Sequence, residues 1–149
     1  FNKDITILDV GAGRGTYQEL LSDYKNIDAV EVFKPNIDKY ELESKYKSVI
    51  NADIKDLEYS NYNLIIFGDI IEHLEVNEAK KVLEYAYNHS DEMIVAVPYN
   101  YKQGIVEDNV YEIHKQDDLT NEIFLERYPY MKLLIGNDVY GYYIKGESI

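Results

Sequence analysis

Ile7-Leu8-Asp9-Val10-Gly11-Ala12-Gly13-Arg14-Gly15-Thr16-Tyr17 joins an apolar run to three glycines at alternating positions. Apolar residues at helical spacing follow this turn, namely Tyr17, Leu20, Leu21 and Tyr24. The pattern is typical of a buried strand that turns into a helix. Glycines at such a turn let the backbone bend sharply, and they let a ligand lie against the main chain where the first N–H groups of the helix face it. The stretch therefore predicts a ligand-binding strand–turn–helix unit.

The spacing of these glycines separates two classes of cofactor. A dinucleotide-binding turn has the form G-x-G-x-x-G, which would require a glycine at position 16, where this chain has Thr16. The third glycine is Gly15, so the pattern is D-x-G-x-G-x-G. This pattern resembles motif I of the class I S-adenosylmethionine-dependent methyltransferases. The resemblance implies S-adenosylmethionine as the cofactor and leaves an NAD-dependent oxidoreductase as the weaker interpretation.

Strand and helix patterns alternate along the rest of the chain. Helices are expected at 16–24, from Pro35 onward, around Val76–Ala86, and from Asp117 and Asp118 through Phe124, while 99–113 is irregular. Strands are expected at 5–10, 27–33, 47–51, 63–68 and 93–97, and this alternation implies a parallel sheet with helices on both faces.

The end of the chain follows a different pattern. The segments 130–135 and 139–145 flank a short turn of Gly136, Asn137 and Asp138, which predicts an antiparallel hairpin. Such a final hairpin separates the methyltransferase sheets from dinucleotide-binding ones. The predicted fold is therefore an α/β, Rossmann-like three-layer sandwich with a seven-stranded, mostly parallel sheet and a C-terminal antiparallel hairpin.

Length and composition set bounds on the organisation of the chain. Residues 1–149 suit one domain with one core. Methyltransferases of this class usually carry helices before the first strand that help to cover the substrate, whereas this chain begins almost on that strand. We therefore expect either that such helices are missing from the N-terminus or that the acceptor site is open.

Charge and residue usage indicate which partners are favoured. The 28 acidic and 15 basic residues give a net charge of −13, which disfavours nucleic acid as a partner. An acidic cleft suits the sulfonium cation of the cofactor, although acidity also serves solubility alone. The absence of cysteine excludes disulfides and thiolate metal sites. No apolar run approaches the ~20 residues of a membrane span and no secretory signal is present, so we expect a cytoplasmic protein. None of this indicates an oligomeric state.

Each strand end supplies a residue type that the resemblance assigns to the cofactor. Gly11, Ala12, Gly13 and Gly15 would form the turn under its methionine portion, and Asp9 would reach the amino group directly or through water.

Further strand ends complete the predicted cofactor site. Glu31 ends the second strand, and a carboxylate there can accept hydrogen bonds from both ribose hydroxyls. Val32 would pack on the adenine face. Asp53 would accept a hydrogen bond from the adenine amine while Ile54 contributes a backbone N–H, although Asp53 also suits a simple loop turn. Asp69 and Ile70 would lie beside the methyl donor.

The segment Asp69-Ile70-Ile71-Glu72-His73-Leu74 raises the question of a metal. In a helical turn, residues 69, 72 and 73 project to one side, where two carboxylates and an imidazole form a plausible ligand set for a divalent ion. The segment resembles the acidic-x-x-Glu-His motif of ubiquinone-biosynthesis O-methyltransferases and small-RNA 2′-O-methyltransferases. The resemblance implies Mg²⁺ or Mn²⁺ held by Asp69, Glu72, His73 and His114, although the RNA enzymes carry Glu where this chain has Asp69. Metal-free methyltransferases share a similar run, in which Glu72 and His73 support the loop, so both interpretations stay open.

Methyl transfer is an in-line displacement that needs alignment of the two reactants and exclusion of water. An oxygen or nitrogen acceptor must also lose a proton, for which His114 is the first candidate base and His73 the second. Tyr99, Tyr101 and Tyr111 could line a pocket for a small-molecule acceptor, although the 16 tyrosines of the chain suit a coding bias toward AT-rich codons equally well. The alternatives are a catalytically silent cofactor-binding or regulatory subunit and a metal-assisted RNA 2′-O-methyltransferase.

Overall fold

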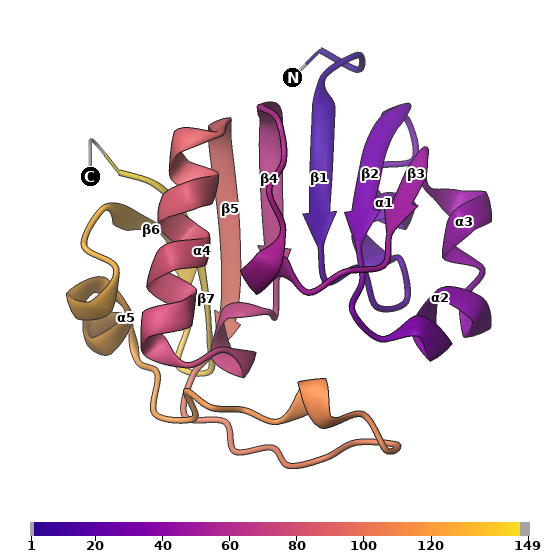
Figure 1. Ribbon diagram of the computed structural model, residues 1–149. Coiled ribbons are helices and arrows are strands. Elements are labelled where there is room, and N and C mark those ends of the chain that lie inside the picture. The colour runs from indigo at the N-terminus through magenta and orange to yellow at the C-terminus, as the bar shows by residue number, and fades with distance from the viewer. Residues whose placement is uncertain (1, 147–149) are drawn as a thin grey trace.

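Within residues 2–146, which the computed structural model describes, seven strands form one sheet (Figure 1). Their order is β3-β2-β1-β4-β5-β7-β6. The first five strands are parallel, and β7 runs antiparallel to both β5 and β6. The strands are β1 Thr6–Val10, β2 Asn26–Val30, β3 Ser48–Ile50, β4 Tyr62–Gly68, β5 Ser90–Pro98, β6 Met131–Gly136 and β7 Tyr140–Lys145. The predicted mostly parallel sheet with its C-terminal antiparallel hairpin is confirmed.

Helices cover both faces of this sheet, as expected. They are α1 Thr16–Leu20, α2 Lys34–Lys39, α3 Leu42–Lys45, α4 Val76–Asn88 and α5 Asn121–Arg127. Three short 3₁₀ turns lie in the connecting segments: η1 Ile54–Asp56, η2 Ile71–His73 and η3 Val110–Glu112. None of the helices in the described part of the chain combines the length and apolarity needed to cross a membrane.

Two hydrophobic clusters, one on each face of the sheet, hold these layers together. Alternate residues of a strand point to opposite faces, so Leu8 joins the cluster under α4 and α5 while Ile7 joins the cluster under α2 and α3. Both side chains are completely buried. The central strands β4 and β5 are covered on both faces, which explains why residues 64–67 and 93–97 appear in the sequence as continuous apolar runs.

The boundaries of two helices differ from the prediction. The first helix ends at Leu20 instead of residue 24, because Ser22 and Asp23 favour turns over helix. Leu20, the last residue of α1, is 73% exposed. The last helix begins at Asn121 rather than at the two aspartates, because the Thr120 side chain accepts a hydrogen bond from the Ile123 N–H and so caps it.

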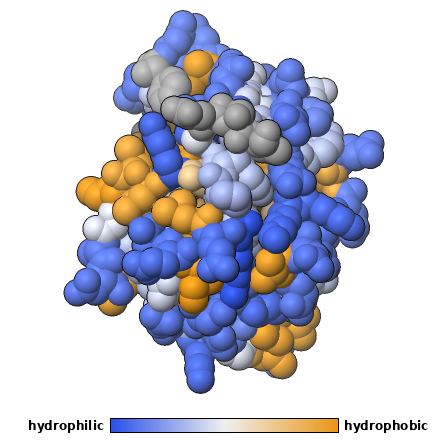
Figure 2. Space-filling view, turned by 90° about the vertical axis from the view of Figure 1, so that its left-hand side faces the viewer, coloured by the Kyte–Doolittle hydropathy of each residue, from blue (hydrophilic) through white to orange (hydrophobic). Residues whose placement is uncertain are grey.

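The strand β6 forms one edge of the sheet. Its residues Leu134 and Ile135 are exposed. Figure 2, which faces the side of the molecule where β6 and α5 lie, shows hydrophobic side chains gathered among hydrophilic ones.

Candidate functional site

A cavity of about 1020 Å³ lies at the carboxyl ends of β1, β2 and β4. Between β1 and β4 the strand order reverses, and ligands of open α/β sheets bind at such a point. The walls come from the glycine turn, from η1 and η2, and from the 99–115 segment that lies beyond β5. The cavity therefore stands where the sequence predicts a ligand.

The glycine turn forms one wall, and its conformation requires glycine. Gly11 has a φ of +73°, and a Cβ there would overlap the side chain of Ile70. Gly13 also lies in the left-handed region, with a φ of +53°. The predicted residues Gly11, Ala12 and Gly13 all line the cavity.

Glu31 ties the end of β2 to this turn. Its Oε1 accepts a hydrogen bond from the Gly13 N–H at 2.9 Å, and its Oε2 accepts one from the Phe33 N–H at 3.0 Å. The side chain is buried against the cavity, and burial raises the pKa of its carboxyl. Each carboxylate oxygen has a second lone pair and can accept a further bond from a ligand.

The neighbouring wall holds Val32, Asp53 and Ile54, as predicted. Asp53 precedes η1, and its Oδ1 accepts a hydrogen bond from the Lys55 N–H at 3.1 Å. Asp53 thus forms the loop turn that the sequence pattern predicted as the alternative to a binding role. It also faces the cavity.

Two of the predicted cofactor residues do not line the cavity. Asp9 shares its strand face with Ile7 and is buried beneath the glycine turn, where the Tyr46 hydroxyl donates to its Oδ2 at 2.5 Å. Its Oδ1 has no hydrogen-bond partner, and burial raises the pKa of the carboxyl to about 6. Gly15 packs against Leu42 and Tyr46 instead of facing the ligand space.

Asp69 lines the cavity with Ile70 but is not among the predicted metal ligands that converge in the structure. Its backbone is left-handed, with a φ of +57°, and only Ile71–His73 form a 3₁₀ turn. The α-helical spacing that would have aligned residues 69, 72 and 73 is therefore absent. The carboxyl of Asp69 instead accepts a hydrogen bond from the Tyr140 hydroxyl.

Glu72, His73 and His114 do converge. Their ligand atoms all lie within 4.8 Å of one another, and the two imidazole centroids are 4.7 Å apart. Glu72 is 1% exposed, and neither of its carboxylate oxygens has a hydrogen-bond partner. Burial, followed by the charge of Asp69, holds the pKa of Glu72 well above its usual range.

Both imidazoles are oriented by backbone carbonyls. The Nδ1 of His73 lies 3.2 Å from the Ile113 oxygen, and the Nδ1 of His114 lies 2.7 Å from the Tyr101 oxygen. Since a carbonyl can only accept, each Nδ1 carries the proton, and in the neutral ring Nε2 keeps its lone pair. Burial lowers the pKa of His73, which favours the neutral form. Either ring can thus take up a proton or bind a metal through Nε2.

The tyrosines divide between the cavity and the core. Tyr101 and Tyr111 line the cavity, as predicted, but Tyr99 does not, because its hydroxyl lies 2.5 Å from that of Tyr143. Sequence reasoning missed three other tyrosines that line it: Tyr17, Tyr140 and Tyr142. It also missed Gln116, whose backbone N–H donates to the backbone carbonyl oxygen of Glu72 at 3.0 Å. Nothing in the sequence marks these residues, because their partners are far away along the chain.

No family model and no curated protein matches this chain. Solved structures of methyltransferases do match it. The DhpI-SAM-HEP complex matches with a TM-score of 0.75 and 10% identity over 96% of this chain and 78% of that one. A S-adenosylmethionine-dependent methyltransferase from Clostridium acetobutylicum ATCC 824 matches with a TM-score of 0.73 and 15% identity over 97% and 84%. The methyltransferase domain of bacterial-CtHen1-CN matches with a TM-score of 0.67 and 19% identity over 97% and 91%. At these identities the likeness concerns the fold.

Proposed function

We propose that this chain, which has the class I methyltransferase fold, is an S-adenosylmethionine-dependent methyltransferase that acts on an oxygen or nitrogen atom of a small-molecule acceptor. The observation that carries the proposal is the joining of Glu31 to the glycine turn at the point where strand order reverses. The cavity there extends without interruption to His73 and His114. Among the similar structures, DhpI is bound to SAM and to HEP, and the plantazolicin methyltransferase BpumL, which matches with a TM-score of 0.70 and 12% identity, is in complex with SAH.

The residues that face the cavity have the chemistry that this cofactor requires. Glu31 would accept hydrogen bonds from the ribose hydroxyls and Asp53 one from the adenine amine, while Val32 packs on the ring. The turn at Gly11 and Gly13 would hold the methionine portion. The Ile54 N–H would complete adenine binding, and Asp69 with Ile70 would lie beside the methyl donor.

The two histidines would act on the acceptor. His114 is the first candidate for general base, because its Nδ1 is committed to the Tyr101 oxygen and its Nε2 can receive a proton. His73, held in the same way by Ile113, is the second. Methyl transfer itself needs the acceptor aligned and water excluded, and the 99–115 segment beside the cavity can provide both.

A divalent ion fits the same cluster. One buried carboxylate without hydrogen-bond partners and two imidazoles form a donor set that Mn²⁺ accepts, and Mg²⁺ to a lesser degree. Glu72, His73 and His114 would hold the ion, and Asp69 could join them only by releasing Tyr140. When bound, the ion would lower the pKa of an acceptor hydroxyl.

The test is a calorimetric titration with S-adenosylhomocysteine, with and without Mn²⁺. We expect micromolar binding that weakens by at least about tenfold in Glu31→Ala, since two charge-assisted bonds are lost. Glu19→Ala removes the same charge from an exposed site on α1 and should bind like the wild type. A separate heat for Mn²⁺ that disappears in Glu72→Gln would assign the ion.

Two outcomes would redirect the proposal. A folded wild-type chain that binds no S-adenosylhomocysteine contradicts it and favours a silent subunit with this fold. Cofactor binding together with salt-sensitive binding of RNA would favour the RNA 2′-O-methyltransferase alternative.

A further inference from the structure

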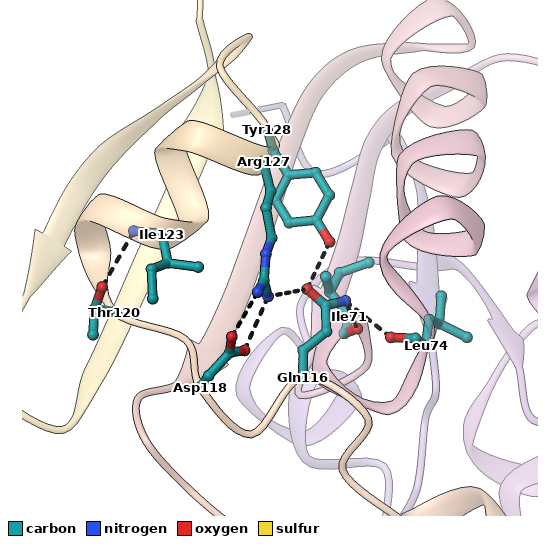
Figure 3. Close-up of polar contacts among 8 residues, drawn as sticks. All are labelled: Ile71, Leu74, Gln116, Asp118, Thr120, Ile123, Arg127 and Tyr128. Carbon is teal, nitrogen blue, oxygen red and sulfur yellow. Dashed lines mark hydrogen bonds and ion pairs between the residues drawn. The ribbon is translucent and has the colours of Figure 1, made fainter.

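The side chain of Gln116 is buried between η2 and α5 (Figure 3). Its Nε2 donates hydrogen bonds to the backbone oxygens of Ile71 and Leu74, each at 2.9 Å. Its Oε1 accepts one bond from Arg127 at 3.1 Å and one from the Tyr128 hydroxyl at 2.8 Å. A primary amide has two donor hydrogens and two acceptor lone pairs, so all four are used here.

The backbone beside this amide holds the same turn. The backbone N–H groups of Lys115 and Gln116 both donate to the backbone carbonyl oxygen of Glu72, at 2.8 and 3.0 Å. Three carbonyls of the 71–74 turn are therefore bound to a two-residue segment. His114 is the next residue in the chain, so these bonds also fix its backbone relative to Glu72.

The other side of the amide is anchored to α5. Arg127 forms two bonds with the Asp118 carboxylate, at 3.0 and 2.6 Å, and Tyr128 is completely buried. Figure 3 shows the amide of Gln116 between this pair and the turn. Because Arg127 and Tyr128 fix its oxygen, the amide cannot rotate away from the two carbonyls that it binds.

We infer that Gln116 is a positioning residue that sets His114 against Glu72 and His73. The effect on methyl transfer rests on the proposed function, whereas the geometric effect does not. Glutamine suits the position because glutamate would direct an oxygen at two carbonyl oxygens, and methionine would fill the volume without any of the four bonds.

The geometric effect can be tested by NMR on the full chain. The wild type should show a nuclear Overhauser effect between the His73 and His114 rings, whose centroids are 4.7 Å apart, and slow exchange of the Lys115 and Gln116 amide protons. Gln116→Met and Gln116→Glu should lose the ring-to-ring effect. His89, stacked on Tyr85 outside the cluster, is the internal reference and should not change.

Thr120→Ala is the matched control, because it weakens α5 at its N-terminal cap without touching the amide. It should lower the unfolding midpoint and keep the effect between the two rings. Retention of that effect in both Gln116 variants would overturn the inference. So would rapid exchange of the two amide protons in the wild type, a result that needs no variant to fold.

Activity provides a second measurement. In Gln116→Met we expect kcat to fall about 10- to 100-fold, as for misplaced catalytic groups, with the Kd for S-adenosylhomocysteine unchanged. An unchanged kcat would refute the catalytic part of the inference. Absence of S-adenosylhomocysteine binding by the wild type would instead refute the proposed function, so the two failures are distinguishable.

Discussion

Asp9 is a buried carboxyl group whose Oδ1 has no hydrogen-bond partner. Burial raises its pKa from 3.8 to about 6, so between pH 4 and 6 the folded protein holds this proton more tightly than the unfolded chain. The free energy of unfolding therefore falls as the pH rises through this range. Asp9→Asn removes the charge and keeps an acceptor for Tyr46. We expect this variant to be more stable than the wild type at pH 7, by about 1–3 kcal/mol.

Urea unfolding at pH 4, 5.5 and 7 would check this prediction. The difference between the two proteins should shrink on acidification and be small at pH 4, where Asp9 is protonated in the folded wild type and only partly ionised in the unfolded chain. A wild type that is equally or more stable than Asp9→Asn at pH 7 would show that the Tyr46 bond outweighs the cost of burial.

The position of a single residue could be predicted where a local sequence pattern marks a turn or the end of a strand. Gly11 and Glu31 belong to this class, because a glycine turn and a strand end are visible in the sequence. The burial of Asp9 beneath the glycine turn was not predicted, since its strand face and not its position in the motif decides what it contacts. Gln116 could not be found, because its four partners only meet it in the folded chain.

At the scale of elements, the loop beyond β5 contains a strained turn. Glu107 and Asp108 have φ angles of +49° and +63°, and the Asn109 N–H donates to the Val106 oxygen at 2.8 Å. Positive φ at both central residues fits a type I′ turn, in which glycine and asparagine are preferred. Asp108→Gly should therefore stabilise the protein by about 0.5–1 kcal/mol.

The hairpin turn offers the matched control for this prediction. Asp138 also lies in a turn, but its φ is not positive, so glycine relieves no strain there. Asp138→Gly should destabilise by about 0.5–1 kcal/mol because it adds freedom to the unfolded chain. Thermal unfolding of both variants would decide, and a shift of the same sign in both would contradict the strain at Asp108.

Elements were predictable where periodicity extends over several residues. The strands, α4 and the final hairpin were located for this reason, although β2 ends at Val30 instead of residue 33 and β5 begins at Ser90 instead of residue 93. The start of α5 was not, because two aspartates and a threonine are competing cap residues within four positions. The structure uses Thr120 as the cap and pairs Asp118 with Arg127.

For the molecule as a whole, charge and burial act in the same direction. The net charge of −13 is relieved by protonation, and burial raises the pKa of Glu31 and Glu72 as well as that of Asp9. A raised carboxyl pKa in the folded state means that stability falls with rising pH. We therefore expect the unfolding temperature of the protein without ligand to rise as the pH is lowered from about 7.5 to about 5.5.

Added salt distinguishes the effect of charge repulsion from the effect of buried carboxyl groups, because salt screens mainly the exposed charges. Added NaCl should raise the unfolding temperature at pH 7.5, where repulsion between acidic side chains is largest, and should do so less at pH 5.5. Calorimetry across both pH values and salt concentrations would measure this. An unfolding temperature that falls on mild acidification would contradict the predicted direction.

The order of the strands has a consequence for the nascent chain. Within the described residues β6 pairs only with β7, which the ribosome translates after it. Similarly, Ile7 of β1 finds Leu64 of β4 only after the chain has been made as far as residue 64. The strand β6 therefore reaches the sheet only through β7, and its free edge carries the exposed side chains of Leu134 and Ile135. Completion of β7 thus joins β6 to β5 and to the rest of the sheet in a single step.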